Sequence, residues 1–279
     1  MTEPRRYSEL DVFTAVPLLG NPLAVVHDGR GLSDAQMAAF ARWTNLSETT
    51  FLLPPTHAEA DYKVRIFTPE RELPFAGHPT LGSCHAWLGA GGRPRSASEV
   101  IQECGVGLVR VKRDGARLAF AAPPLKRSGP LEPELLARIV KGLGLQPGDV
   151  VDHQWVDNGP GWCAVRLQSA SRALEVKPDY AQLRGMSLGV VAPHPAGGEV
   201  QFEVRALIGH GSGYEDPVTG SLNASLAQWL IGSGIAPVQY VAAQGAALRR
   251  AGRVHVQRAG ADTWIGGDVC EVVAGTVTL

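Results

Sequence analysis

The 279-residue chain is poor in several features that would point to whole classes of protein. Its few cysteines are Cys84, Cys104, Cys163 and Cys270. They form no Cys-x-x-Cys pair, so we expect neither a disulfide framework nor a zinc site, but free, buried thiols. No apolar run approaches the roughly 20 residues of a membrane-spanning helix, and the polar start of the chain is unlike a secretory signal. We therefore expect a cytoplasmic protein without a membrane partner.

Concentrated positive charge is also missing. Lysine and arginine number 26 against 27 acidic residues, which gives a net charge of −1, and no basic block exceeds a few residues. This balance argues against nucleic acid as a partner. The phosphate-loop, nucleophile-elbow and HExxH motifs are absent, and Gly105-Val106-Gly107 is too short to indicate dinucleotide binding. We therefore expect proton-transfer chemistry that uses no cofactor and no metal.

What the sequence does contain is a pair of similar turns. The first runs from Phe75 to Ser83 and the second from Glu215 to Ala224. Each places a proline, small residues and an ionisable side chain before an apolar run that ends in Trp-Leu. This pattern predicts the start of a buried helix, where unpaired N–H groups and the positive end of the dipole favour an anion. Two such helix starts could hold a small, negatively charged molecule.

The spacing of other residues supports a duplication. Trp87 and Trp229 lie 142 residues apart, and so do Gln102 and Gln244. We interpret the chain as two related halves, each made of strands around one helix. A chance resemblance between glycine-rich turns is the alternative. At 44% hydrophobic and 19% charged residues, the chain has the composition of a globular protein with enough material for two cores.

Periodicity predicts a strand-rich chain with a few helices. An amphipathic helix is expected over 34–44 with Ser33 as its N-cap. The other expected elements are strands at 10–14, 23–26, 51–53 and 62–67, an apolar helix over 80–88, a meander over 100–120 with its hairpin turn at 113–116, a linker at 123–130, a surface helix over 132–143, strands at 162–167 and 201–208, a second apolar helix over 222–230, and strands at 254–256, 263–265 and 269–279.

Three side chains are candidates for proton transfer. Glu48 lies between a helix and a strand among apolar neighbours, where partial burial would raise its pKa towards that of a useful acid or base; a solvent-facing glutamate is the alternative. His78 stands at a predicted helix start, where the dipole favours the neutral imidazole; a structural turn histidine is the alternative. Asp216 precedes Pro217, and an ordinary capping aspartate is the alternative. Gly77 and Gly220 would let a ligand approach the backbone closely.

At these residues the sequence resembles a known family, and it is identified as a member of the PhzF-like isomerases, named for the phenazine biosynthesis enzyme. The resemblance covers nearly the whole chain. Its motifs are Asp11-Val12-Phe13-Thr14, Gly20-Asn21-Pro22-Leu23-Ala24-Val25-Val26, Asn45-Leu46-Ser47-Glu48-Thr49, Arg65-Ile66-Phe67-Thr68-Pro69, Leu73-Pro74-Phe75-Ala76-Gly77-His78-Pro79-Thr80 and Glu215-Asp216-Pro217-Val218-Thr219-Gly220-Ser221.

The resemblance implies a diaminopimelate epimerase-like α+β fold. Two pseudo-symmetric lobes would each form a β-barrel-like sheet around a central helix, with the active site in the cleft between them. The expected N-terminal lobe covers residues 1–125, with a strand from about 266–279 packed on it, and the expected C-terminal lobe covers 126–265. Members of the family commonly form homodimers.

The resemblance also implies an activity: isomerisation by a proton shift without a cofactor, as for trans-2,3-dihydro-3-hydroxyanthranilate. Glu48 would be the general base and acid, and His78 and Asp216 would assist proton transfer. The substrate-binding residues would be Gly77, Pro79, Thr80, Gly220, Ser221 and Leu222. Related racemases use one cysteine at each helix start, but neither turn here contains a cysteine, so a two-thiol mechanism is disfavoured. The alternative is a non-catalytic protein that binds small molecules on the same scaffold.

Overall fold

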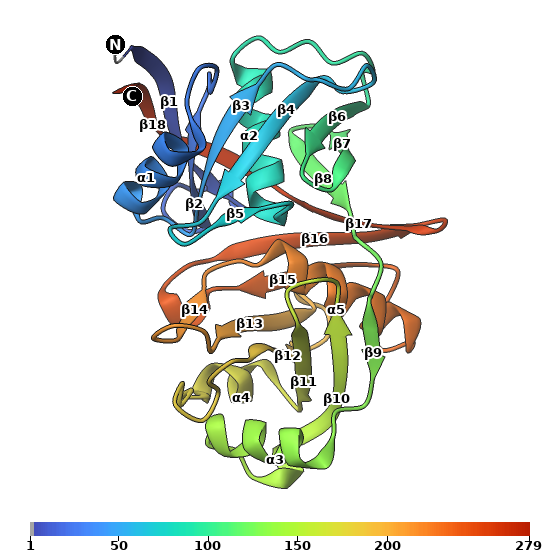
Figure 1. Cartoon of the computed structure of the whole chain (residues 1–279). Helices are drawn as coiled ribbons and strands as arrows, with labels where there is room; N and C mark the ends of the chain where they lie inside the picture. The colour runs from blue at the N-terminus through green and yellow to red at the C-terminus, as the bar shows by residue number, and fades with distance from the viewer. Residues whose placement is uncertain (1–2) are drawn as a thin grey trace. The chain divides into compact units, whose positions relative to one another are not determined.

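The computed structural model of the protein describes residues 3–279, which divide into two compact units (Figure 1). Unit 1 comprises the chain up to Ala121 together with Gly266–Leu279, and unit 2 comprises Ala122–Ile265. The first boundary lies four residues before the expected one at 125/126, because the backbone N–H of Ala122 already bonds to Thr263 O in unit 2. Within the described residues, no helix is both long and apolar enough to cross a membrane.

Unit 1 contains the two ends of the chain, which lie together because the last strand pairs antiparallel with the first (Figure 1). Its elements are β1 Pro4–Val12, β2 Asn21–Val26, α1 Asp34–Thr44, β3 Glu48–Leu53, β4 Tyr62–Phe67, β5 Glu72–Leu73, α2 Gly77–Gly89, β6 Glu99–Cys104, β7 Gly107–Asp114, β8 Arg117–Ala121 and β18 Val269–Thr278.

Unit 2 is built from the middle of the chain. Its elements are β9 Arg127–Gly129, α3 Pro133–Gly142, a short 3₁₀ turn at Pro147–Asp149, β10 Val150–Asp157, β11 Trp162–Leu167, α4 Ala170–Glu175, β12 Ser187–Pro193, β13 Phe202–Ile208, β14 Tyr214–Asp216, α5 Gly220–Gly232, β15 Gln239–Gln244, a 3₁₀ turn at Ala246–Leu248, β16 Gly252–Ala259 and β17 Asp262–Gly267, whose last two residues cross into unit 1.

The two units share one order of strand pairings. In unit 1, β2 pairs antiparallel with β1 and parallel with β3; β4 pairs antiparallel with β3 and β5 and parallel with β6. The same series of pairings runs through β10 to β15 in unit 2. Helices α1 and α4 make the first parallel crossover of their units, and α2 and α5 make the second. The predicted duplication is therefore confirmed, and chance resemblance is wrong.

The two central helices are enclosed by strands. Helix α2 contacts β1, β2, β3, β4, β6, β7, β8 and β18, and helix α5 contacts β10, β11 and β16. Small residues let strands come close: a Cβ on Gly82 of α2 would lie 2.4 Å from Leu23 Cδ2, and one on Gly189 of β12 would lie 2.6 Å from Leu222 Cδ1 of α5. The uniformly apolar character that predicted buried helices follows from this enclosure.

Helix α1 has the predicted limits. Its N-cap Ser33 accepts from the Gln36 N–H at 3.3 Å, and the Gln36 side chain accepts from the Ser33 N–H at 3.0 Å. This reciprocal capping box satisfies two backbone donors at the helix start. The helix ends at Thr44, and its C-cap Asn45 has a left-handed backbone with φ of 54°. Three residues later Glu48 opens β3, so the end of α1 sets where this carboxylate begins its strand.

The structure corrects one prediction and adds several strands. The expected linker at 123–130 contains β9, whose Arg127 guanidinium lies 3.5 Å from the centre of the Trp155 ring while the strand pairs with β10. Strands β5, β10, β12, β14 and β15 and helix α4 were not predicted. Strand β12 is buried on both faces, so it lacks the alternation that identifies a half-buried strand.

Candidate active site

Helix α2 begins without a side chain that satisfies its first backbone N–H groups. The N-cap Ala76 is extended and offers no side-chain oxygen. The first N–H to bond within the helix is that of Thr80, which reaches Ala76 O at 3.2 Å, and Pro79 has no N–H. The N–H groups of Gly77 and His78 have no recorded partner in the described part of the chain. Two donors at the positive end of a helix dipole suit a carboxylate oxygen.

The side chain of His78 is almost completely buried, with 5% exposed. Burial lowers its pKa to about 3, against the opposing effect of a hydrogen bond to the Pro22 backbone. Because proline has only a carbonyl to offer, the ring must donate to it. Nε2 faces Glu48, so Nδ1 is the donor, and the neutral ring carries its lone pair on Nε2. The prediction of a neutral histidine at this helix start is confirmed, with burial rather than the dipole as the first cause.

Glu48 lies beside this ring, with its Oε2 3.4 Å from His78 Nε2. Its side chain is 15% exposed, so the expected partial burial is confirmed and the solvent-facing alternative is wrong. Parallel pairing of Glu48 with Leu23 sets its place at the start of β3. While His78 is neutral the contact is no ion pair: it joins a carboxyl group to an imidazole lone pair, an arrangement in which one proton can be held between the two atoms.

In unit 2, helix α5 begins in the same way as α2. Its N-cap is Thr219, whose side chain makes no capping bond, and the N–H groups of Gly220, Ser221 and Leu222 have no recorded partner among the residues that the structure describes. Asp216 is the last residue of β14 and accepts a hydrogen bond from the Thr219 hydroxyl at 2.5 Å. Asp216 therefore does not occupy the N-cap position, and its interpretation as an ordinary cap is wrong.

Two side chains hold Ser221 at this helix start. Trp162 Nε1 donates to the serine Oγ at 3.1 Å, and Asn158 Nδ2 donates to its backbone oxygen at 3.0 Å. Asn158 lies in the β10–β11 turn and Trp162 opens β11. In unit 1, Pro22 at the start of the equivalent strand β2 supplies the carbonyl that holds His78. In each unit, the start of this strand thus holds the second residue of the central helix.

The two glutamines that indicated the duplication have a role that the sequence did not reveal. Gln244 Oε1 accepts from Thr219 N–H at 3.0 Å and from Asn223 Nδ2 at 2.8 Å. Its Nε2 donates to Asp216 O and to Thr219 Oγ1, each at 3.0 Å. Gln102 similarly donates to Thr80 Oγ1 at 3.0 Å. Each buried amide anchors the start of a central helix to a neighbouring strand.

Three predicted binding residues have limited access to a ligand. Thr80 is fully buried and accepts from Gln102, while its N–H bonds within the helix. Pro79 is buried and has no N–H. The Leu222 side chain is fully buried, which leaves only its N–H for a ligand. Among the predicted binding residues, Gly77, Gly220, Ser221 and Leu222 can still offer a backbone N–H, and Ser221 a half-buried side chain.

Comparison of equivalent positions in the strand pairings and central helices of the two units shows where their candidate catalytic residues differ. Glu48 pairs with Leu23 as Ser187 pairs with Trp162, so unit 2 has a serine where unit 1 has its glutamate. His78 and Ser221 are both the second residue of a central helix. Asp216 occupies the strand position that Leu73 has in unit 1. Each half therefore supplies one predicted proton-transfer carboxylate, from a different element.

The cysteines are free, as predicted: Cys84, Cys104 and Cys163 are buried and Cys270 is half-buried. Burial raises the pKa of Cys84 and of Cys163 to about 12, so neither thiol is a ready nucleophile. In the described part of the chain, no three His, Cys, Asp or Glu side chains are grouped to hold a metal ion.

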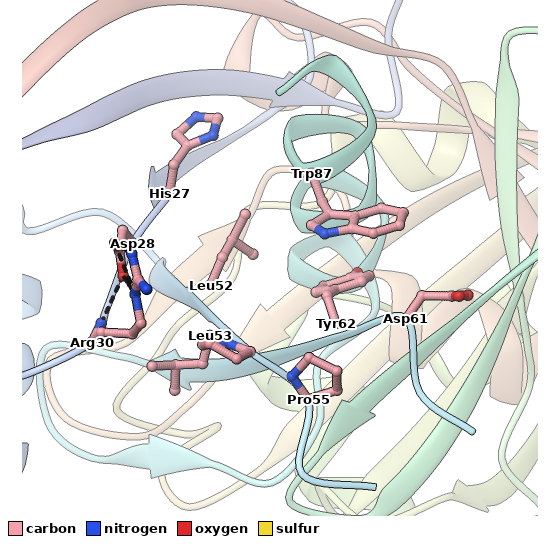
Figure 2. Close-up of a pocket in the computed structure, with 10 residues that line it drawn as sticks. His27, Asp28, Arg30, Leu52, Leu53, Pro55, Asp61, Tyr62 and Trp87 are labelled. Carbon is pink, nitrogen blue, oxygen red and sulfur yellow. Dashed lines mark hydrogen bonds and ion pairs between the residues drawn. The ribbon is translucent and has the colours of Figure 1, made fainter. Parts of the chain in front are cut away.

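A separate hollow of about 260 Å³ opens in unit 1 (Figure 2). Its lining residues are His27, Asp28, Arg30, Leu52, Leu53, Pro54, Pro55, Asp61, Tyr62 and Trp87. Figure 2 shows Trp87 stacked on Tyr62 and Arg30 paired with Asp28. Trp87 belongs to the C-terminal turn of α2, whereas His78 belongs to its first turn. None of the predicted site residues lines this hollow, so we do not assign the chemistry to it.

Solved structures place the fold. A PhzF-family phenazine biosynthesis protein from Enterococcus faecalis superimposes with a TM-score of 0.83, at 24% identity over the whole of both chains. A predicted epimerase from Pseudomonas aeruginosa gives 0.79 at 27% identity, covering 98% of this chain and 99% of its own. A probable proline racemase from Agrobacterium radiobacter gives 0.61 at 15% identity, covering 99% and 93%. The chain has the diaminopimelate epimerase-like fold.

Curated relatives point to the same class. An uncharacterized isomerase from Mesorhizobium japonicum is 37% identical over 244 residues, which cover 81% of this chain and 80% of the relative. The trans-2,3-dihydro-3-hydroxyanthranilate isomerase of Pseudomonas aeruginosa is 38% identical over 184 residues, covering 64% and 63%. The protein is an isomerase. More specifically, it belongs to the phenazine biosynthesis-like family, PhzC-PhzF, whose sequence profile matches residues 10–268.

Proposed function

We propose that the protein is a cofactor-independent isomerase or epimerase that moves a proton on a small, carboxylate-bearing substrate. The observation that carries this proposal is the contact of Glu48 with the buried, neutral ring of His78, at the start of α2, whose first N–H groups have no recorded partner within residues 3–279. The Pseudomonas aeruginosa relative isomerises trans-2,3-dihydro-3-hydroxyanthranilate by its name, and a compound of this class is the first substrate to test.

In the proposed reaction Glu48 removes a proton from a substrate carbon. The electron pair of the broken C–H bond moves into the adjacent unsaturated or carbonyl group. The proton then returns to another carbon in an isomerisation, or to the opposite face of the same carbon in an epimerisation. One C–H bond breaks and one forms, so no oxidant or reductant is needed. Because His78 Nδ1 donates to Pro22, its Nε2 is free to accept a hydrogen bond from protonated Glu48 between the two steps.

In this proposal, the helix starts bind the negatively charged carboxylate of the substrate. The N–H groups of Gly77 and His78 in unit 1, and of Gly220, Ser221 and Leu222 in unit 2, are preorganised donors for a carboxylate or for charge that develops in the transition state. In the same proposal, Asp216 is the second proton-transfer group. The expected homodimer also stays a prediction, which light scattering of the purified protein would test.

The test is proton NMR in D₂O with the purified protein, trans-2,3-dihydro-3-hydroxyanthranilate and a panel of small carboxylic and amino acids. Wild type is compared with Glu48→Gln and with Glu59→Gln, a matched change at an exposed position of the same unit. We expect solvent deuterium at a substrate carbon with wild type and with Glu59→Gln. Removing a positioned acid/base should lower turnover by about 10²–10⁴-fold in Glu48→Gln.

Two results would count against the proposal. Near-wild-type turnover by Glu48→Gln would remove Glu48 as the base. A ligand that binds without exchanging any proton, and whose affinity is the same for wild type and Glu48→Gln, would instead favour a non-catalytic small-molecule binding protein.

A further inference from the structure

Each unit contains an arginine whose guanidinium forms a bidentate pair with a glutamate. In unit 1, Arg65 Nε and Nη2 donate to the two carboxylate oxygens of Glu72 at 2.7 and 2.6 Å. In unit 2, Arg205 Nε and Nη2 donate to the two oxygens of Glu215 at 3.0 and 2.7 Å. Paired parallel bonds of this kind fix orientation as well as distance.

The two pairs occupy equivalent positions. Glu72 lies opposite Phe67 in the β4–β5 pairing, and Glu215 lies opposite Leu207 in the β13–β14 pairing. Each arginine precedes that opposite residue by two positions, so it shares its face of the sheet. Each glutamate also lies five residues before the glycine that opens the next central helix. Neither the sequence motifs nor the equally spaced tryptophans and glutamines had indicated this repeat of an arginine–glutamate pair.

Each arginine also reaches the helix of the first crossover. Arg65 Nη1 donates to Asp34, the first residue of α1, at 2.6 Å. Arg205 Nη1 donates to the backbone oxygens of Ala173 and Val176, at the end of α4, at 2.9 and 2.6 Å. The guanidinium in each unit therefore ties together three pieces of chain: its own strand, the short strand that follows, and the preceding helix.

The strands that carry the glutamates need such support. Strand β5 has two residues and β14 has three, so few ladder bonds hold them. A proline follows each strand directly, at Pro74 and Pro217, and contributes no N–H. In each unit three residues, the proline included, connect the short strand to the helix start that bears His78 in unit 1 or Ser221 in unit 2.

We propose that Arg65 with Glu72, and Arg205 with Glu215, are duplicated positioning pairs that hold the turns presenting the two helix starts. They touch no reacting atom; they act by fixing the path of the chain into α2 and α5. As a role in catalysis, the inference rests on the proposed function. As a statement about the order of the turns, it can be tested without any substrate.

The experiment uses the unit 1 pair, which is the more exposed: the side chains of Arg65 and Glu72 are 22% and 41% exposed, so the variants should fold. Arg65→Met, Glu72→Gln and the double variant are compared with wild type. The matched control is Arg30→Met, which removes another bidentate pair, with the two carboxylate oxygens of Asp28, from the same unit (Figure 2). Amide hydrogen exchange of peptides covering residues 73–81 is followed by mass spectrometry, and kcat and KM are measured on trans-2,3-dihydro-3-hydroxyanthranilate.

We expect exchange in residues 73–81 to become about fivefold faster in Arg65→Met and Glu72→Gln, as the loss of a partly exposed bidentate pair allows, and to be unchanged in Arg30→Met. The double variant should be no worse than either single variant, because the pair acts as a unit. On the substrate, kcat should fall about tenfold with little change in KM, since a small misplacement of catalytic groups is costly.

Unchanged exchange at 73–81 in both single variants would overturn the positioning role. So would faster exchange with an unchanged kcat, because the turn would then move without affecting catalysis. If wild type itself transforms no compound of the panel while exchange changes as expected, the proposed function fails and the structural role of the pair stands.

Discussion

Replacing Arg205 by methionine should destabilise unit 2 far more than the equivalent change at Arg65 destabilises unit 1. Arg205 and Glu215 have only 4% and 5% of their side chains exposed, and Arg205 makes four hydrogen bonds, two to Glu215 and two to backbone oxygens. Its removal leaves a buried carboxylate with no cation beside it. Breaking a buried pair by removing one partner costs about 3–5 kcal/mol of unfolding free energy.

Arg65→Met in unit 1 removes three hydrogen bonds, but these bonds are exposed to solvent. Arg65 is 22% exposed, and its partners Glu72 and Asp34 are 41% and 84% exposed. Water can solvate the carboxylates left behind, so the cost should be about 1 kcal/mol. The two variants therefore differ by roughly 2–4 kcal/mol although they remove equivalent side chains.

Urea denaturation followed by circular dichroism measures this difference, with Arg172→Met as a control that removes partly exposed pairs from unit 2. If unit 2 unfolds as a separate transition, its midpoint in Arg205→Met should move to markedly lower urea with the unit 1 transition in place. Equal losses for Arg205→Met and Arg65→Met would refute the reasoning, because burial would then not decide the energetic role of the pair.

Two further predictions concern the helix starts. Because the pKa of His78 is about 3 in the folded state and near 6.5 in an unfolded chain, the unfolded state binds more protons between these values, and stability should fall as the pH drops below about 6.5. At pH 5 the protonation of His78 in the unfolded state should lower the free energy of unfolding by about 2 kcal/mol. The urea midpoints at pH 7 and pH 5 should therefore differ less in His78→Asn than in wild type. An unchanged difference would contradict the lowered pKa of His78. Gln244→Leu should lower the free energy of unfolding by about 3 kcal/mol or more, because its partners, the buried Thr219 and the half-buried Asp216, lose their hydrogen bonds. Gln239→Leu, at an exposed position of the same strand, should lower it little. Equal thermal midpoints for the two variants would exclude the anchoring role of Gln244.

Much of the fold could be predicted because its signals are local. The limits of α1 follow from the capping signal at Ser33 and the spacing of Met37, Phe40 and Ala41, and the structure has those same limits. Strand β4 alternates in burial, which is the signal by which it was predicted. Strand β12 could not be found this way, because both its faces are buried and its apolar run carries no period.

Other features depended on contacts between distant residues. The segment at 123–130 has the composition of a linker, yet Arg127–Gly129 forms a strand because β10 offers it a partner. Asp216 has the residue type of a cap, but strand pairing with Ala206 places it before the helix, where Thr219 takes the cap position. Local propensity is outweighed in both cases by pairing between segments far apart in the chain.

The sequence by itself determined the family, the duplicated plan and the identity of the candidate residues, because these are recorded in ordered motifs and in spacing. Only the tertiary structure decided what surrounds them. It buried His78 and so kept it neutral, it brought Glu48 within 3.4 Å of the ring, and it placed Arg65 and Arg205 on the glutamates that precede the two helices. Desolvation and hydrogen bonding between distant residues exist only once the chain is folded, so no pattern in the sequence could state them.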